Sequence, residues 1–504
     1  MTYRRILIIV ASSRFMRWHE RLRDSLSRRW PDAEVAFSFD PRGDDQPSSV
    51  TQLLTLERML LRRNKAALSD RIPACPTAAP ASGADVAIDL IGDAPAAGAA
   101  RVLRPLYDGH ASDQGAVAAI LSGAVPALAV EDAATGAVLI QGLPSFEAAE
   151  GLTGALESVY SRIGALIERA LSAPDGIGAQ PAPRIERHPR HPAAFIARII
   201  AFEAARWLYH LCCYSPHWRI GWRLVDGPGV IETGDLSGPR WRALPDQETS
   251  FAADPFPIEW RGQTGVFYEL LDYRTNTGEI YFQPFDDSGP IGAPVRALKE
   301  PWHLSYPFLI EEEGALFMVP EASVSGAITL YRCVDFPTRW EPVAKLVEGV
   351  EAADATIFRH GGRYWMTSVV RDGYGGYSDT LAIHHAPSLF GPWEAHALSP
   401  VLVDSRVARP AGAVVSRNGV LLRPVQDCSK GYGKGLAIMR IDALDPGNFR
   451  QTLVARLGPG KHWPGNRLHS LNRFGRLEVI DGAVITPKYM PLRRALHERI
   501  DAHA

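Results

Sequence analysis

Hydrophobic positions in the first third of the chain follow two different spacings. Residues 6–11 are a continuous apolar run, typical of a strand covered on both faces of a sheet, and residues 84–91 (ADVAIDLI) resemble another buried strand. Residues 18–30 and 152–171 repeat their apolar positions with helical spacing. Strands that alternate with helices predict a Rossmann-like α/β domain with a parallel sheet over residues 1–175. Neither GxGxxG nor GxxxxGK[ST] follows the first run, so no motif supports a dinucleotide or P-loop phosphate site.

The next region, residues 176–215, combines a linker with one long helix. Residues 176–192 are rich in proline, glycine and arginine, which predicts a linker. Residues 193–214 are largely apolar for about six helical turns. Ionisable side chains interrupt this stretch and exclude a transmembrane segment; they are Arg198, Glu203, Arg206 and His210. Two interpretations remain: a helix packed between domains and a helix at a membrane interface.

From about residue 249 short strands alternate with glycine, proline and aspartate turns. One unit recurs five times: a polar residue in a turn, an apolar strand, a turn with glycine and an aromatic strand. The leading residues of the units are 52, 48, 55 and 60 positions apart; they are Asp254, Tyr306, Asp354, Arg409 and His469. This spacing is near the length of a four-stranded propeller blade. Together with a predicted strand at residues 217–223, it predicts an all-β, five-bladed β-propeller over residues 216–495, with the leading residues converging on its axis.

Composition narrows the classes of partner. The 54 basic and 56 acidic residues give a net charge of −2, which excludes a global electrostatic attraction to nucleic acid. The five cysteines form no CxxC pair, so we expect neither structural zinc nor a disulfide framework. The first apolar run is too short for a signal peptide. We therefore expect a cytoplasmic protein without a transmembrane segment, and peripheral contact with a membrane stays open.

Two stretches of the α/β region resemble the N-terminal domain of folate-dependent formyltransferases: residues 108–112 (DGHAS) and 134–141 (ATGAVLIQ). That family has an Asn two residues before the His and an Asp just before the Thr-Gly. Here Asp108 and Ala134 stand in those places, so His110 alone remains of the three catalytic residues. The resemblance implies a formyltransferase-like fold. Because the oxyanion-binding and pKa-tuning groups are missing, we expect it to be catalytically inactive.

The Asp254-Pro-Phe turn resembles the first-blade motif of glycoside hydrolase family 43 propellers. The resemblance implies that Asp254 is the catalytic base, that Asp354 tunes pKa and orients the substrate, and that His469 is the axial histidine that holds water or a cation. The family's general acid, a Glu in the fourth repeat, is replaced by Arg409. Glu321 is our candidate for a displaced acid.

Further motifs resemble the propeller region of plant glucosamine inositolphosphorylceramide transferases and of bacterial proteins named after them. The motifs are residues 303–308 (HLSYPF), 319–322 (VPEA) and 423–429 (RPVQDCS). In the plant proteins a separate C-terminal domain belongs to a known transferase family, so the name alone does not transfer an activity. These motifs and the repeats give our candidate substrate-binding residues: His303, Tyr306, Arg409, Arg423, Asp427, Lys430 and His469.

The missing acid changes the expected chemistry. A phosphate leaving group needs positive charge rather than a proton, and basic side chains gather in the repeat that lost the acid: Arg409, Arg423, Lys430 and Lys434. We therefore expect glycosyl transfer from a phosphate-linked sugar to a glycan or glycolipid acceptor, with Asp254 as base or nucleophile. A furanosidase-like glycoside hydrolase and a non-catalytic glycan-binding propeller are the alternatives. No cofactor is expected, with a divalent cation near His469 as the one alternative.

Overall fold

The computed structural model describes residues 2–42, 47–60, 66–73, 83–93, 98–173, 184–245 and 249–503. The chain forms two compact units, residues 1–204 with 372–376 and residues 205–371 with 377–504. Residues 176–183 of the predicted linker and Cys75 lie outside the described residues. None of the helices described is long and apolar enough to cross a membrane.

The first unit is an α/β domain around one mixed sheet. The strands, in spatial order, are β2 (Glu34–Asp40), β1 (Arg5–Ala11), β3 (Val86–Asp89), β4 (Val102–Tyr107), β5 (Leu128–Asp132) and β6 (Val138–Gly142). Pairing is parallel from β2 to β4 and antiparallel from β4 to β6. Helices and strands both form as predicted, but the mixed sheet does not clearly support a Rossmann-like domain, because the last two strands pair antiparallel. Five residues join β5 to β6, too few for the crossover that parallel strands need.

Helices pack on the sheet and bury their apolar side chains against it. They are α1 (Arg17–Arg29), α2 (Ser48–Leu60), α3 (Gln114–Ser122) and α4 (Gly151–Ser172), with a short 3-10 turn, η1 (Ser12–Arg14). α4 packs on β4, β5 and β6 and also contacts α1, α2 and α3. Glu57 of α2 caps its start, because the Glu57 carboxylate accepts hydrogen bonds from the backbone N–H of Leu152 at 2.7 Å and Thr153 at 2.8 Å.

The long helix α5 (Pro192–Cys212) follows, as predicted, and ends two residues earlier than expected because β7 (Cys213–Leu224) begins at once. The boundary between the two units falls inside α5, between residues 204 and 205. From residue 200 to its end, every side chain of the helix is exposed except the half-buried Tyr209.

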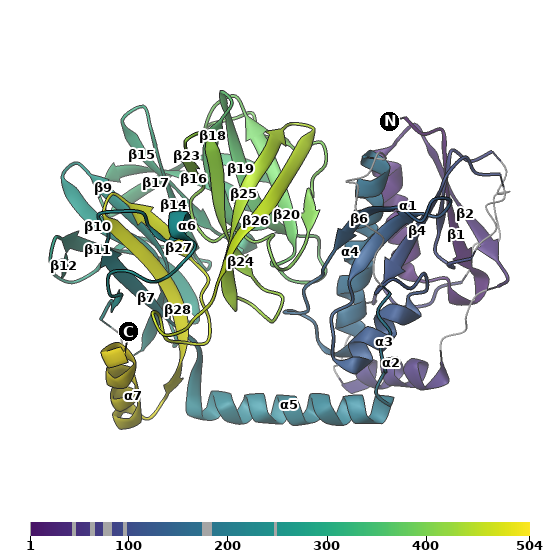
Figure 1. The fold of residues 1–504 in the computed structure, drawn as a ribbon, viewed down its shortest axis with the longest axis horizontal. Helices are drawn as coiled ribbons and strands as arrows, with labels where there is room; N and C mark the ends of the chain where they lie inside the picture. Colours follow the sequence, from purple (N-terminus) through teal and green to yellow (C-terminus); the bar gives the residue numbers. More distant parts are fainter. Residues whose placement is uncertain are drawn as a thin grey trace. The chain divides into compact units, whose positions relative to one another are not determined.

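The second unit contains five antiparallel sheets, the blades of a β-propeller (Figure 1). Blade 1 is β9 (Ser250–Trp260), β10 (Gln263–Asp272), β11 (Thr277–Asp286), β12 (Gly289–Pro290) and β13 (Val295–Leu298). Blade 2 is β14 (Ser305–Glu312), β15 (Ala315–Glu321), β16 (Ala327–Asp335) and β17 (Arg339–Glu348). Blade 3 is β18 (Glu351–His360), β19 (Arg363–Arg371), β20 (Thr380–Ala386), β21 (Glu394–Ala395) and β22 (Leu402–Val403). Blade 4 is β23 (Val415–Arg417), β24 (Val420–Asp427), β25 (Gly435–Asp445) and β26 (Asn448–Leu457).

The fifth blade joins the two ends of the propeller sequence. Its strands, in spatial order, are β27 (Leu471–Phe474), β28 (Leu477–Pro487), β7 and β8 (Arg242–Ala243). β7 pairs antiparallel with β28 along most of its length, so the first strand of the unit completes its last blade. This closes the ring and confirms the predicted five-bladed propeller. Three short helical elements complete the described chain: α6 (Val230–Thr233), η2 (Ser323–Ser325) and α7 (Met490–His503).

The leading residues of the first three repeats share an unusual backbone. Asp254, Tyr306 and Asp354 have φ of 52°, 43° and 54°, in the left-handed region that non-glycine residues rarely adopt. In each case the pairing of the first two strands of the blade shifts register around that residue. Such bulges re-aim side chains and are frequent beside functional sites. In three of the five repeats, the leading residue found in the sequence is therefore the residue at which the first strand of the blade bulges.

Candidate active site

A cavity of about 530 Å³ lies in the second unit, where the first strands of the blades meet. Its wall combines carboxylates, histidines and aromatic rings. The lining residues are His210, Cys213, Tyr214, Pro216, Trp218, Phe251, Asp254, Glu269, Leu271, Tyr273, Asn276, His303, Ser305, Glu321, Arg409, Tyr432, His469 and Lys488. All of them belong to the second unit, so the cavity is a property of the propeller and the segments attached to it.

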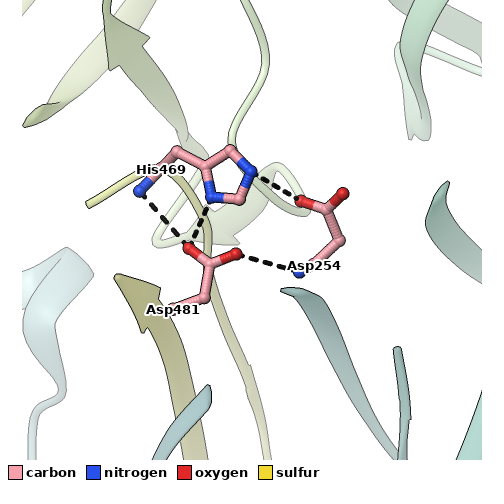
Figure 2. Close-up of side chains that lie close together, drawn as sticks. All are labelled: Asp254, His469 and Asp481. Carbon is pink, nitrogen blue, oxygen red and sulfur yellow. Dashed lines mark hydrogen bonds and ion pairs between the residues drawn. The ribbon is translucent and has the colours of Figure 1, made fainter. Parts of the chain in front are cut away.

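A chain of hydrogen bonds fixes Asp254 at the wall of the cavity (Figure 2). His469 Nδ1 lies 2.6 Å from Asp481 Oδ1, and His469 Nε2 lies 3.4 Å from Asp254 Oδ1. The other oxygen of Asp481 accepts a hydrogen bond from the backbone N–H of Asp254 at 2.9 Å. Asp481 is fully buried in β28, so one carboxylate orients both the imidazole and the backbone of the residue that it faces.

The surroundings shift the pKa values of both Asp254 and His469 upward. Burial raises the pKa of Asp254 to about 7; His469 opposes this shift, and the charges of Asp481 and Asp354 add to it. Burial would lower the pKa of His469, but Asp481 and Asp254 raise it above its usual value. Asp254 can therefore accept or return a proton near neutral pH, which is the property that a general base needs.

Two further carboxylates, those of Asp354 and Glu321, lie beside Arg409. Its Nε lies 2.6 Å from Asp354 Oδ2, and its Nη2 lies 3.7 Å from Glu321 Oε2. Gln426 also donates to Asp354 Oδ2, at 3.1 Å. Burial raises the pKa of Asp354 to about 7; Arg409 opposes this shift and Glu321 adds to it. Arg409 thus neutralises part of the charge of two carboxyls rather than standing open to a ligand.

Glu269 supplies a third acidic group, held by His303. The backbone N–H of Gly278 donates to His303 Nδ1 at 3.0 Å, so the proton of the neutral ring is on Nε2, which lies 3.4 Å from Glu269 Oε1. Burial lowers the pKa of His303 and raises that of Glu269 well above its usual value, an effect that the charge of Asp254 increases. Burial therefore favours the protonated form of Glu269.

Aromatic rings form the opposite part of the wall. Trp218 stacks on the imidazole of His469, with ring centroids 3.8 Å apart and planes 19° apart. Tyr432 meets the same imidazole edge-on at 5.4 Å and lies under the guanidinium of Arg409 at 4.7 Å. A Cβ on Gly433, which has φ of 60°, would come within 2.8 Å of Trp218, so only glycine fits beside this stack. Flat rings beside carboxylates are a suitable surface for a sugar, with its apolar face and its hydroxyl rim.

The predicted alternative of a divalent cation near His469 has a geometric basis. Ligand atoms of Asp254, His469 and Asp481 lie within 4.8 Å of one another. The atoms nevertheless bind each other, and hard divalent cations prefer a larger set of oxygen ligands. The residues fit a hydrogen-bonded triad better than a metal centre, and the cation stays a prediction.

The structure brings together most of the predicted site residues. Asp254, Glu321, His303, Arg409 and His469 all line the cavity. Asp354 is not among the residues that line the cavity, but it forms an ion pair with Arg409, which is.

Two of the predicted substrate contacts lie elsewhere. Tyr306 is fully buried, with its hydroxyl 2.8 Å from Thr356 Oγ1 and accepting from the backbone N–H of Gly412 at 2.8 Å; only its backbone N–H reaches Asp254, at 3.3 Å. Arg423 is also fully buried and donates to the carbonyls of Val407 and Ala408. Both side chains therefore hold the strands around the site and do not line the cavity, and a role for them in binding substrate stays a prediction.

The predicted basic clamp is not assembled. Asp427 accepts hydrogen bonds from Ser429 and pairs with Arg456, and neither it nor Lys430 lines the cavity. Of the four basic residues expected around a phosphate, Arg409 alone lines the cavity among the residues described, and it is paired with carboxylates. A phosphate-binding role for Lys430 stays a prediction.

Sequence reasoning missed Glu269, Asp481 and Gln426. Glu269 stands in the apolar run of β10 and Asp481 in that of β28, and both are buried. A single acid within an apolar strand costs free energy unless it is paired or protonated. That mismatch is the signal in the sequence that points to Glu269 and Asp481, and it lies outside the repeated turns.

Comparisons with known proteins concern the propeller. Residues 243–480 match the family model described as glucosamine inositolphosphorylceramide transferase 1, N-terminal. The protein of that name from Arabidopsis thaliana is 32% identical over 253 residues, which are 47% of this chain and 33% of the relative. Its namesake from Oryza sativa subsp. japonica is 29% identical over 250 residues, 46% of this chain and 33% of the relative. The chain thus spans about a third of the length of these relatives, and the predicted resemblance is confirmed for plant proteins, not bacterial ones.

Solved structures with a similar fold include glycosidases. A thermostable family-43 glycoside hydrolase is 13% identical with a TM-score of 0.33, covering 46% of this chain and 86% of that one. The catalytic domain of a GH62 alpha-L-arabinofuranosidase from Coprinopsis cinerea is 14% identical with a TM-score of 0.35, covering 51% and 85%. Similarity at this level carries no functional argument, and the five blades rest on the sheet topology.

Proposed function

We propose that this protein is a carbohydrate-active enzyme that transfers a glycosyl group to a hydroxyl acceptor in glycolipid synthesis, with Asp254 as the general base. The observation that carries the proposal is the triad of Asp481, His469 and Asp254 at the wall of the cavity, where burial brings the pKa of Asp254 to about 7. The similarity of residues 243–480 to plant proteins named as glycolipid transferases supports the same class of reaction.

In the proposed reaction the acceptor hydroxyl loses its proton to Asp254 as its oxygen bonds to the anomeric carbon of the donor sugar. The bond from that carbon to the leaving oxygen breaks, and the leaving oxygen takes a proton from a carboxylic acid. Glu321 is the predicted acid and lines the cavity, while Glu269 lines it too and has a pKa that burial raises well above its usual value. Comparing Glu321→Gln with Glu269→Gln identifies the residue that donates the proton. The variant that lacks this residue should regain its turnover with a sugar donor whose leaving group needs no proton, and the other variant should not change.

The charge of the cavity bears on the donor. Five buried or nearly buried carboxyls pair with Arg409, His469 or His303; they are Asp254, Glu269, Glu321, Asp354 and Asp481. This surplus of acid favours a leaving group that accepts a proton over one that carries its own negative charge. A phosphate-linked donor, our first expectation, is therefore the weaker form of the proposal.

Glycoside hydrolysis is the second candidate, and one observation favours it: Glu321 lines the same cavity as Asp254, which supplies the acid that the fourth repeat lacks. In that reaction water takes the place of the acceptor hydroxyl. Non-catalytic glycan binding is disfavoured because a binding site gains nothing from carboxyls held near their titration point.

A mass-spectrometric screen tests the proposal. The full chain is incubated with sugar donors and glycolipid acceptors in water enriched in oxygen-18, and products are weighed. Transfer adds one sugar mass to the acceptor without oxygen-18, whereas hydrolysis places oxygen-18 in the released sugar. Loss of either product in Asp254→Ala supports catalysis at this cavity; an unchanged rate in that variant would remove Asp254 from the mechanism.

We also propose that the first unit is a scaffold without formyltransferase activity. Its Asp108 is buried, accepts from the backbone N–H of Ala127 at 2.9 Å and pairs with Arg187 at 2.9 Å. His110 Nε2 lies 3.1 Å from the carbonyl oxygen of Ile185. A carboxylate in place of the family's amide repels a developing oxyanion. Assay of formyl release from a formylated folate tests this, and measurable turnover that His110→Ala abolishes would contradict it.

A further inference from the structure

The segments beside the cavity expose an unusual amount of apolar surface. Eight large hydrophobic side chains on α5 from residue 200 onward and around the start of α7 are 49% to 70% accessible to solvent; they are Ile200, Phe202, Trp207, Leu208, Leu211, Ile485, Tyr489 and Leu492. Trp207 is 68% exposed and Tyr489 is 70% exposed. Single exposed hydrophobics are ordinary, but a group of this size marks an interaction surface.

Helical spacing gathers part of this group on one side of α5. Ile200, Trp207 and Leu211 are seven and four residues apart, so they share one face, and Leu208 borders it. Among the residues described, nothing covers the last turns of the helix, since residues 205–208 and 210–212 are all exposed. The sequence of α5 is therefore more apolar than a solvated helix requires.

This surface continues into the candidate active site. His210 of α5, Cys213 and Tyr214 at the start of β7, and Lys488 just before α7 all line the cavity. The Lys488 ammonium donates to the carbonyl oxygen of His210 at 2.6 Å and lies 5.5 Å from the centre of the Tyr214 ring. The C-terminal end of α5 and the N-terminal end of α7 thus meet beside the cavity, at the same end of β7 and β28 (Figure 1).

The charges around the surface fit an anionic layer. Arg206, Lys488 and Arg494 are exposed among the apolar side chains, against the exposed acids Glu203 and Glu498. Lysine and arginine beside tryptophan and tyrosine are characteristic of helices that lie at the boundary of a bilayer, where the long basic side chains reach the headgroups.

We propose that the surface formed by the C-terminal half of α5 and the start of α7 docks on an anionic bilayer and presents a membrane-embedded acceptor to the cavity. The docking itself rests on the exposed side chains, whereas the presentation of an acceptor rests on the proposed function. The apolar side chains enter the headgroup boundary, and the glycolipid headgroup reaches the carboxylates past Tyr214 and Lys488, while its chains stay in the bilayer.

Flotation of the full chain with vesicles tests the docking. Vesicles of phosphatidylcholine with phosphatidylglycerol as the minor component should carry the protein upward, and phosphatidylcholine alone should carry less. The double variant Trp207→Glu with Leu211→Glu should lower the vesicle partition coefficient at least about tenfold. Glutamate is a good helix former and neither residue lines the cavity, so α5 should remain folded.

A matched control adds the same charge elsewhere. Phe390 and Val454 are 54% and 53% exposed, so Phe390→Glu with Val454→Glu should float like the unmodified protein. Equal flotation of the α5 variant and the unmodified protein would overturn the proposal. Failure of the unmodified protein to float, with the α5 variant changing a dimer into a monomer, would show a contact between two copies and would also overturn it.

The activity assay separates docking from function. The α5 variant should lose most of its turnover with a vesicle-embedded acceptor and keep it with the water-soluble headgroup of the same lipid. Equal loss with both acceptors would overturn the presentation of a lipid. Flotation that depends on Trp207 and Leu211, in a protein that transfers no sugar to either acceptor, would support the docking and contradict the proposed function instead.

Discussion

Replacing Asp254 by Asn should lower turnover by orders of magnitude and at the same time stabilise the propeller above neutral pH. The side chain is 5% exposed, and burial raises its pKa from 3.8 to about 7. In the unfolded chain the carboxyl ionises near its ordinary value, so between these two pH values the folded state binds the extra proton. Stability therefore falls as the pH rises through this window, and an amide, which does not ionise, removes the loss.

The magnitude follows from the shift. Each pKa unit corresponds to about 1.4 kcal/mol, so ionising Asp254 in the folded protein costs about 4 kcal/mol. The difference in the free energy of unfolding, Asp254→Asn minus unmodified, should rise by about that amount between about pH 4 and about pH 8. Turnover should fall by about 10²–10⁴-fold, the usual contribution of a general base.

Urea denaturation followed by tryptophan fluorescence is a suitable assay, because ten of the twelve tryptophans belong to the second unit. Measurements at both ends of the pH window give the difference directly, and Asp226→Asn serves as a control because Asp226 is exposed on the propeller surface. A difference that does not change with pH would refute the reasoning, since it would mean that Asp254 ionises as easily in the folded protein as in the unfolded one.

Three further substitutions test the surroundings. Asp481→Asn removes the partner that raises the pKa of His469, so NMR titration of the imidazole should give a lower pKa and urea denaturation a loss of about 3–5 kcal/mol; an unchanged titration would contradict this. Arg409→Met removes the cation that opposes the raised pKa of Asp354, so the pH optimum of turnover should move upward, and a downward shift would be inconsistent with the geometry. Glu57→Gln leaves at least one N–H at the start of α4 without its acceptor, so thermal unfolding should show a loss of about 1–2 kcal/mol with turnover unchanged; reduced turnover would argue against a purely structural role.

The propeller could be predicted because its repeat is local. The same kind of unit recurs in every blade, and three of its leading residues, Asp254, Tyr306 and Asp354, share a left-handed backbone at a bulge in the first strand. The closure of the ring could not be read in the same way. β7 and β28 are separated by more than 250 residues, and pairing over that distance has no signature in either strand alone.

The candidate site could be predicted only in part, for a physical reason. Position on the repeat predicts which residues start a blade, and it correctly gathered Asp254, Arg409 and His469. It does not predict which way a side chain turns once the backbone is bulged, so Tyr306 was expected in the cavity and instead packs beneath it. Asp481 lies on a second strand, outside the repeated position, and only the three-dimensional arrangement reveals its part in the triad.

The comparison of Asp254→Asn with Asp226→Asn in the glycosyl-transfer assay tests the central claim most directly. Both substitutions remove one carboxylate from the same propeller, one buried at the cavity and one exposed at the surface. The account predicts that sugar transfer to the acceptor falls to background in Asp254→Asn and stays at the unmodified rate in Asp226→Asn. Equal transfer rates in the two variants would contradict catalysis at this cavity.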